Sequence, residues 1–156
     1  MLLLYVFEPQ PEIIKKAKKL FKKIKNISFM SNEVEAINLK PDILYLGSVF
    51  QYIYNLNNFL KNIKKINPKE IIIYDLLSGS NPTFYSYQNF YGKQMLVKFY
   101  NYKYLIRKFK SIGYELIFSS NIQREILGTL QSPPMSNFKK KYRIFFPKQI
   151  QLKKKK

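Results

Sequence analysis

The segment that most constrains the fold is residues 41–77, PDILYLGSVFQYIYNLNNFLKNIKKINPKEIIIYDLL. It holds two short apolar runs, Ile43–Leu46 and Ile71–Tyr74, and the second has the β-branched composition typical of a strand buried on both faces of a parallel sheet. Between them, apolar residues recur mostly at three- and four-residue spacings over positions 50–63, which predicts a helix with one buried face. Two buried strands joined by a helix form a right-handed βαβ unit, so we predict an α/β fold.

The carboxyl ends of these two predicted strands are the first candidate site. Ligands of parallel sheets bind at this edge, which here carries Gly47, Ser48 and Asp75. Asp75 is a candidate catalytic residue, because a buried carboxylate can take a proton from a hydroxyl acceptor; the alternative is that it only caps the following loop. Gln51 is the second catalytic candidate, since its amide can hydrogen-bond a cofactor or an acceptor, and the alternative is a polar residue at a helix start.

These residues also carry a resemblance. The run DILYLGSVFQYI, a helix and then NPKEIIIYDLL is similar to the second half of class I S-adenosylmethionine-dependent methyltransferases. More narrowly, it resembles a family of small bacterial methyltransferases with a strand-Ser-x-x-Gln-Tyr motif, and the likeness extends from about Leu2 to Ser120. The resemblance implies a Rossmann-like methyltransferase sheet, mostly parallel with an antiparallel edge strand. It also implies that Gly47, Ser48 and the pair Gln51 and Tyr52 lie beside the S-adenosylmethionine pocket.

The start of the chain supplies the remaining candidates for cofactor binding. Leu2–Phe7 predicts a buried strand that ends at Glu8. A carboxylate at a strand end in nucleotide-binding sheets accepts hydrogen bonds from ribose hydroxyls, worth roughly 1.5–3 kcal/mol each, and the resemblance assigns this role to Glu8. Solvent exposure is the alternative. After a second predicted strand, Ile27–Met30, the resemblance places Ser31 or Asn32 against the adenine amine, whereas a helix cap is the alternative for both.

The sequence departs from the family in the glycine-rich loop that holds the methionine part of the cofactor. Its first glycine is Gly47, and the chain begins at what the resemblance makes the second strand, so that the first strand, the centre of the usual sheet, is missing. We therefore expect either a truncated C-terminal fragment of a methyltransferase or a reduced domain that does not bind the cofactor. The strands ending at Glu8 and Gly47 must then pair directly or leave an open sheet edge, through which a homo-oligomer can form.

The other elements are predicted from shorter patterns. We expect helices over Glu12–Lys25, Asn32–Ile37 and Asn101–Ile112, and strands over Tyr114–Ser119 and Tyr142–Phe146, the last of them as the antiparallel edge strand. The first helix is expected to bury Ile13, Ile14, Ala17, Leu20, Phe21 and Ile24. Residues 78–93 show no clear period and predict a loop over the pocket mouth. The domain is predicted to span residues 1–150, with a disordered basic tail over 151–156, because its terminal lysines repel one another and bury nothing.

Composition limits the chemistry. The 156 residues include no cysteine and no histidine, which excludes disulfides, thiolate metal sites, cysteine nucleophiles and the commonest general base, and no metal site is predicted. No apolar run approaches the ~20 residues of a membrane span, so a cytoplasmic protein is expected. The net charge of +19 is mostly lysine spread along helices among many Asn, Ile and Tyr, which favours codon bias and a solvated surface over nucleic-acid binding. Only Lys139–Phe146 interleaves Arg and aromatic residues with lysine.

The sequence thus favours methyl transfer from S-adenosylmethionine to a small-molecule or saccharide acceptor. This reaction depends on holding donor and acceptor in line, so the absence of His and Cys is no objection. Two alternatives stay open. One is a non-catalytic basic α/β domain that binds nucleic acid or an anionic surface, and the other is a pseudoenzyme that pairs with another subunit through its open sheet edge.

Overall fold

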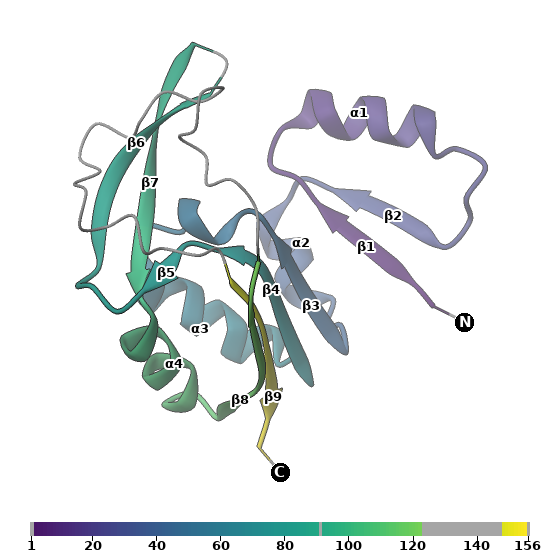
Figure 1. Cartoon of the computed structure of the whole chain (residues 1–156). Helices are drawn as coiled ribbons and strands as arrows, with labels where there is room; N and C mark the ends of the chain where they lie inside the picture. The colour runs from purple at the N-terminus through teal and green to yellow at the C-terminus, as the bar shows by residue number, and fades with distance from the viewer. Residues whose placement is uncertain (1, 91, 123–147, 156) are drawn as a thin grey trace. The chain divides into compact units, whose positions relative to one another are not determined.

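The structure is a computed structural model that describes residues 2–90, 92–122 and 148–155, with only the backbone of 89 and 90 (Figure 1). The chain divides into two compact units, Met1–Lys40 and Pro41–Lys156, here called the N-terminal and the C-terminal unit. No helix of the described residues is long and apolar enough to cross a membrane.

The N-terminal unit consists of β1 (Leu4–Phe7), α1 (Pro11–Leu20), β2 (Ile27–Met30) and α2 (Glu33–Asn38). Strands β1 and β2 are parallel and in register from one end to the other, and these elements confirm the predicted strand–helix–strand–helix order. Helix α1 starts at Pro11, where the missing N–H is not needed, and it ends before the predicted limit at Lys25.

The apolar stripe of α1 is mostly exposed, contrary to the prediction. Ile14 is buried, but Ile13 is 44% exposed, Leu20 78% and Ile24 45%. The period of the stripe is helical, yet it has only two four-residue strands to pack against. An amphipathic pattern therefore predicted the helix correctly and its degree of burial wrongly.

The main sheet of the C-terminal unit has the strand order β3-β4-β9-β8, built from β3 (Ile43–Gly47), β4 (Glu70–Leu76), β9 (Lys148–Lys154) and β8 (Tyr114–Asn121). β3 and β4 are parallel, as predicted, and β9 is antiparallel to both of its neighbours. The described residues thus include an antiparallel strand, and it lies inside the sheet rather than at an edge. The segment predicted to form it, 142–146, lies outside the described residues.

Strand β9 also corrects the predicted disordered tail over 151–156, which is wrong for 151–154. Ile150 and Leu152 are fully buried and pair with the buried residues of β4. Gln151 donates from Nε2 to Glu70 Oε2 at 2.7 Å, and the Lys154 amide donates to the Lys69 carbonyl at 2.9 Å. Among the lysines and glutamines of this segment, Ile150 and Leu152 stand two residues apart, and this period-two pattern buries one face of a strand.

Two helices pack on one face of this sheet, α3 (Leu56–Ile66) and α4 (Tyr102–Lys110), as seen in Figure 1. Their inward residues form one core cluster with the sheet: Leu60, Ile63, Leu105 and Phe109 from the helices and Ile71, Ile73, Ile150 and Leu152 from the strands. α3 is preceded by the one-turn 3₁₀ helix η1 (Phe50–Tyr52), so the predicted continuous helix over 50–63 is split. Asn67 ends α3 in the left-handed conformation, with φ of 56°.

Residues 78–101 form a second, three-stranded sheet in place of the predicted loop over 78–93. Its strands are β5 (Ser78–Gly79), β6 (Phe84–Phe90) and β7 (Lys93–Asn101), in the order β5-β7-β6, and β6 and β7 make a long antiparallel hairpin. The period-two pattern of β6 was missed because it is inverted: Ser86 and Gln88 are buried, whereas Tyr85 and Tyr87 are more than 40% exposed. Polar residues thus point inward, which no hydrophobicity pattern identifies.

Strands β1 and β3 are each paired on one side only within the described part of the chain, β1 with β2 and β3 with β4. The strands that end at Glu8 and Gly47 belong to different units, so the expected choice between their direct pairing and an open edge stays a prediction.

Candidate functional site

The parallel strands β3 and β4 end at the same edge of the sheet. Gly47 is in register with Tyr74, and the Ser48 amide donates to the Tyr74 carbonyl at 3.1 Å, so the ladder continues to the strand ends. The sheet therefore brings the predicted residues Gly47, Ser48 and Asp75 together, as the βαβ pattern indicated.

Two residues of this edge have a backbone conformation that L-amino acids rarely adopt. Ser48 has φ of 54° and Asp75 has φ of 63°. Such residues cost about 1–3 kcal/mol each and concentrate at functional sites. The turn after β3 is thus made by Ser48 rather than by Gly47. A Cβ at Gly47 would instead come within 2.7 Å of the Tyr45 ring, so the glycine makes room for that side chain.

Side-chain hydrogen bonds of Gln51 and Tyr52 hold the segment that follows β3 in place. Gln51 is 2% exposed, and its Nε2 donates to the Ser48 carbonyl at 2.7 Å. The Tyr52 hydroxyl donates to Gln88 Oε1 on β6 at 3.2 Å. Burial raises the pKa of the Tyr52 hydroxyl, and the nearby negative charge of Asp75 adds to this effect. Tyr52 therefore stays protonated and remains a hydrogen-bond donor.

Several polar side chains of the C-terminal unit are buried. Asp75 is 1% exposed, and Ser78 on β5 and Ser86 and Gln88 on β6 are buried as well. Within the described part of the chain, Ser78 Oγ, Ser86 Oγ, Gln88 Nε2 and Gln51 Oε1 have no hydrogen-bond partner. Buried polar atoms without partners cost about 1–3 kcal/mol each, so they call for an explanation beyond packing.

The N-terminal unit has its own strand-end residues. β1 and β2 are parallel, and the Glu8 amide donates to the Met30 carbonyl at 3.0 Å, so Glu8, Ser31 and Asn32 follow the same edge of this two-stranded sheet. Glu8 is half-buried, and one of its carboxylate oxygens accepts from the Gln10 amide at 2.9 Å. Asn32 caps α2, since its Oδ1 accepts from Val34 and Glu35 amides, which is the structural alternative considered for it. Ser31 is exposed.

The sequence did not identify the contribution of the hairpin. Ser86 and Gln88 of the hairpin are buried, and Gln88 accepts the hydrogen bond of Tyr52; the only sign of this in the sequence was polarity in a region with many tyrosines. The basic segment 139–146 lies outside the described residues. The described residues also include no group of three or more Asp, Glu, His or Cys placed to hold a metal ion.

No protein-family model and no curated protein matches the sequence. A Listeria monocytogenes protein assigned to the S-adenosylmethionine-dependent methyltransferases matches in structure with a TM-score of 0.65 at 13% identity, over 99% of this chain and 80% of that one. For the 1,6-didemethyltoxoflavin-N1-methyltransferase of Burkholderia thailandensis, with bound 1,6-didemethyltoxoflavin and S-adenosylhomocysteine, the TM-score is 0.61 at 10% identity, over 97% and 61% of the chains. For TYW2 of M. jannaschii in complex with AdoMet, the TM-score is 0.52 at 14% identity, over 98% of this chain and 58% of that one.

These matches establish the fold. The chain has an α/β fold with a Rossmann-like methyltransferase sheet, which confirms the predicted fold class. It spans between 58% and 80% of the length of the three structures.

Proposed function

We propose that this protein is an S-adenosylmethionine-dependent methyltransferase, or part of one, that acts on a small-molecule acceptor. The supporting observation is the strand arrangement: parallel β3 and β4, with antiparallel β9 between β4 and β8, in a chain of which at least 97% matches each of three solved structures, two of them described as methyltransferases and the third in complex with AdoMet. The Burkholderia enzyme is bound to 1,6-didemethyltoxoflavin, which supports a small-molecule acceptor.

The residues at the strand ends fit the polar parts of the cofactor. Glu8 follows a parallel strand and offers a carboxylate to the two ribose hydroxyls, as nucleotide-binding sheets do. Ser31 is better suited than Asn32 to the adenine amine, because the Asn32 side-chain oxygen already accepts two backbone amides. When bound, S-adenosylmethionine supplies an activated methyl group on its sulfonium, so the protein mainly orients the reactants.

The residues after β3 and β4 would border the methyl-transfer centre. Gly47 and Ser48 are partly exposed and offer backbone groups to the methionine part. Gln51 acts as a positioning residue, because its hydrogen bond to the Ser48 carbonyl holds that turn. Asp75 is the proposed proton acceptor, and because it is 1% exposed, it meets a hydroxyl acceptor only after a rearrangement of the residues around it.

Calorimetric titration with S-adenosylhomocysteine tests the proposal. We expect saturable binding by the protein and by the control variant Glu12→Gln, which changes an acid of α1 that does not follow a strand. Glu8→Gln should weaken binding at least about tenfold, because each ribose hydrogen bond to the carboxylate is worth roughly 1.5–3 kcal/mol. The proposal fails if the unaltered protein shows no saturable heat, or if Glu8→Gln binds as tightly as Glu12→Gln.

The pseudoenzyme alternative has one observation in its favour. β3 pairs only with β4 within the described residues, and a strand from another subunit can pair with its other edge. Absence of S-adenosylhomocysteine binding, together with a dimer in light scattering, would favour this alternative over methyl transfer.

A further inference from the structure

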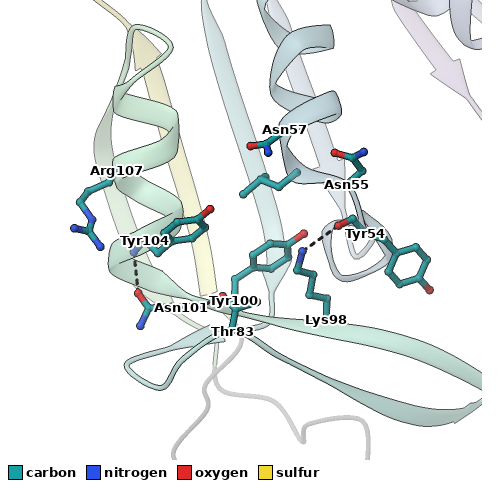
Figure 2. A pocket seen from close by; sticks show the side chains of 10 residues that line it. Tyr54, Asn55, Asn57, Thr83, Lys98, Tyr100, Asn101, Tyr104 and Arg107 are labelled. Atoms are coloured by element: carbon teal, nitrogen blue, oxygen red, sulfur yellow. Dashed lines mark hydrogen bonds between the residues drawn. The ribbon is translucent and has the colours of Figure 1, made fainter.

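The C-terminal unit contains a cavity that is separate from the buried strand-end residues. Its volume is about 820 Å³, and it lies between residues 54–57 at the start of α3, Thr83, β7 and the first two turns of α4. Figure 2 shows its lining, which is Tyr54, Asn55, Leu56, Asn57, Thr83, Lys98, Tyr100, Asn101, Tyr104 and Arg107. The lining thus combines two cations, several amide and hydroxyl groups and three tyrosine rings.

Lys98 is the central feature of this cavity. Its side chain comes from β7 and is buried, with 8% of the residue exposed. Its ammonium donates to the Tyr54 carbonyl at 3.0 Å and lies 4.9 Å from the centre of the Tyr100 ring (Figure 2). An ammonium has three donors, and a carbonyl and aromatic faces compensate only part of the cost of burying its charge.

Among the described residues, no negative charge lines the cavity. None of the lining residues is Asp or Glu, and in the described part of the chain no ion pair joins a carboxylate to Lys98 or Arg107. Two other acids of the unit have partners of their own: Asp42 pairs with Lys69 at 2.8 Å, and Glu115 pairs with Lys155 at 3.7 Å. A buried lysine with no counter-ion among the described residues, open to a cavity that a second cation also lines, favours an anionic ligand.

The local backbone adds to this preference. Asn55 and Asn101 cap the N-termini of α3 and α4, and both line the cavity. The positive ends of two helices therefore border the cavity. The volume far exceeds that of a free oxyanion, and the amide, hydroxyl and ring groups suit a ligand body with hydroxyl groups.

We propose that this cavity binds a small phosphorylated compound, with the phosphate at Lys98 and the hydroxyl-bearing body against Tyr100, Tyr104 and the asparagine side chains, on the side of Arg107. The two cations differ in role. Lys98 is buried and provides most of the affinity, whereas Arg107 is exposed, so that water screens its contribution. Binding at this cavity does not depend on methyl transfer.

The test is a titration with glucose 6-phosphate, with glucose and inorganic phosphate as partial probes, followed by calorimetry and by amide shifts in NMR spectra. We expect saturable binding of glucose 6-phosphate, weaker binding of inorganic phosphate and none of glucose. Lys98→Met, which keeps the length of the buried chain, should weaken binding at least tenfold, and Arg107→Met about threefold. The matched controls are Lys93→Met on β7 and Lys110→Met on α4, neither of which lines the cavity.

Three results would overturn the proposal. The first is the absence of saturable binding of glucose 6-phosphate by the unaltered protein. The second is equal weakening by the cavity variants and by Lys93→Met and Lys110→Met, which would mean general attraction to a basic surface. The third is unchanged binding in both Lys98→Met and Arg107→Met. If Lys98→Met does not fold, Arg107→Met alone decides, because Arg107 is exposed and its replacement leaves the core intact.

Discussion

The two units of this chain start from the same kind of sequence and reach different degrees of packing. Each has an amphipathic helix between two parallel strands. In the C-terminal unit, thirteen buried residues form one core cluster. In residues 2–40 of the N-terminal unit, Ile14 and Met30 are the only buried apolar side chains that the structure describes. The difference lies in the sheet: four strands give two helices a surface to cover, whereas two short strands do not. Apolar periodicity thus predicts an element, and the width of the sheet decides how much of it is buried.

Replacing a core aromatic residue should show the largest difference between the units. Phe109→Ala removes a fully buried ring of α4 and should lower the free energy of unfolding by about 3–5 kcal/mol. Phe21→Ala, at the end of α1, removes a ring that is 38% exposed and should cost less than about 1.5 kcal/mol. Urea unfolding followed by circular dichroism measures both. Equal losses would mean that the N-terminal unit has a core comparable to that of the C-terminal unit.

The second-largest expected difference between the units is the stability that each loses at alkaline pH. Burial raises the pKa of Tyr100 and Tyr114 in the C-terminal unit, whereas Tyr5, the only tyrosine of the N-terminal unit, is 40% exposed. The unfolded chain loses its tyrosine protons above about pH 10 while the folded C-terminal unit keeps them, so stability is lost as pH rises above 10. For Tyr100 the loss at pH 11 should be about 1.4 kcal/mol.

The measurement is urea unfolding at pH 9 and pH 11. Tyr100→Phe is less stable at both pH values, because it lacks the hydrogen bond to the Ile53 carbonyl, but its stability should fall less between them. Tyr5→Phe serves as the control and should show the same fall as the unaltered protein. A Tyr100→Phe protein with the full pH dependence would contradict the explanation.

The smallest expected difference between the units is the stability lost when a helix-capping asparagine is replaced. Asn101 caps α4 through the Tyr104 amide and also donates to the carbonyls of Ser80 and Asn81 at 3.0 Å. Asn101→Ala should cost about 1–2 kcal/mol, and Asn32→Ala, which loses only the cap of α2, about 0.5–1 kcal/mol. Asn101→Asp keeps the cap acceptor and loses the donors, so its cost in urea unfolding should fall between these values. The reverse order would mean that the contacts of Asn101 to residues 80 and 81 add nothing.

The sequence predicted much of the candidate site. Gly47, Ser48 and Asp75 lie at one edge because parallel strands end at the same side, and Glu8, Ser31 and Asn32 share an edge for the same reason. Local chemistry also indicated that Asn32 could cap a helix. The burial of Gln51 and of the polar hairpin residues Ser86 and Gln88 was not predicted, since no hydrophobicity pattern marks buried polar side chains.

The amino-acid sequence by itself determined the order of helices and strands through residue 77 and the α/β class, because periodicity, prolines and β-branched runs act over a few neighbouring residues. Tertiary structure alone decided three features: the central place of β9 despite its lysines, the hairpin with polar residues on its buried face, and the cavity around Lys98. Each depends on partners distant in the chain. Lys154, for example, finds its backbone partner at Lys69, and Lys98 finds its own at Tyr54. No local pattern records such pairings, because their free energy arises only when the partners meet.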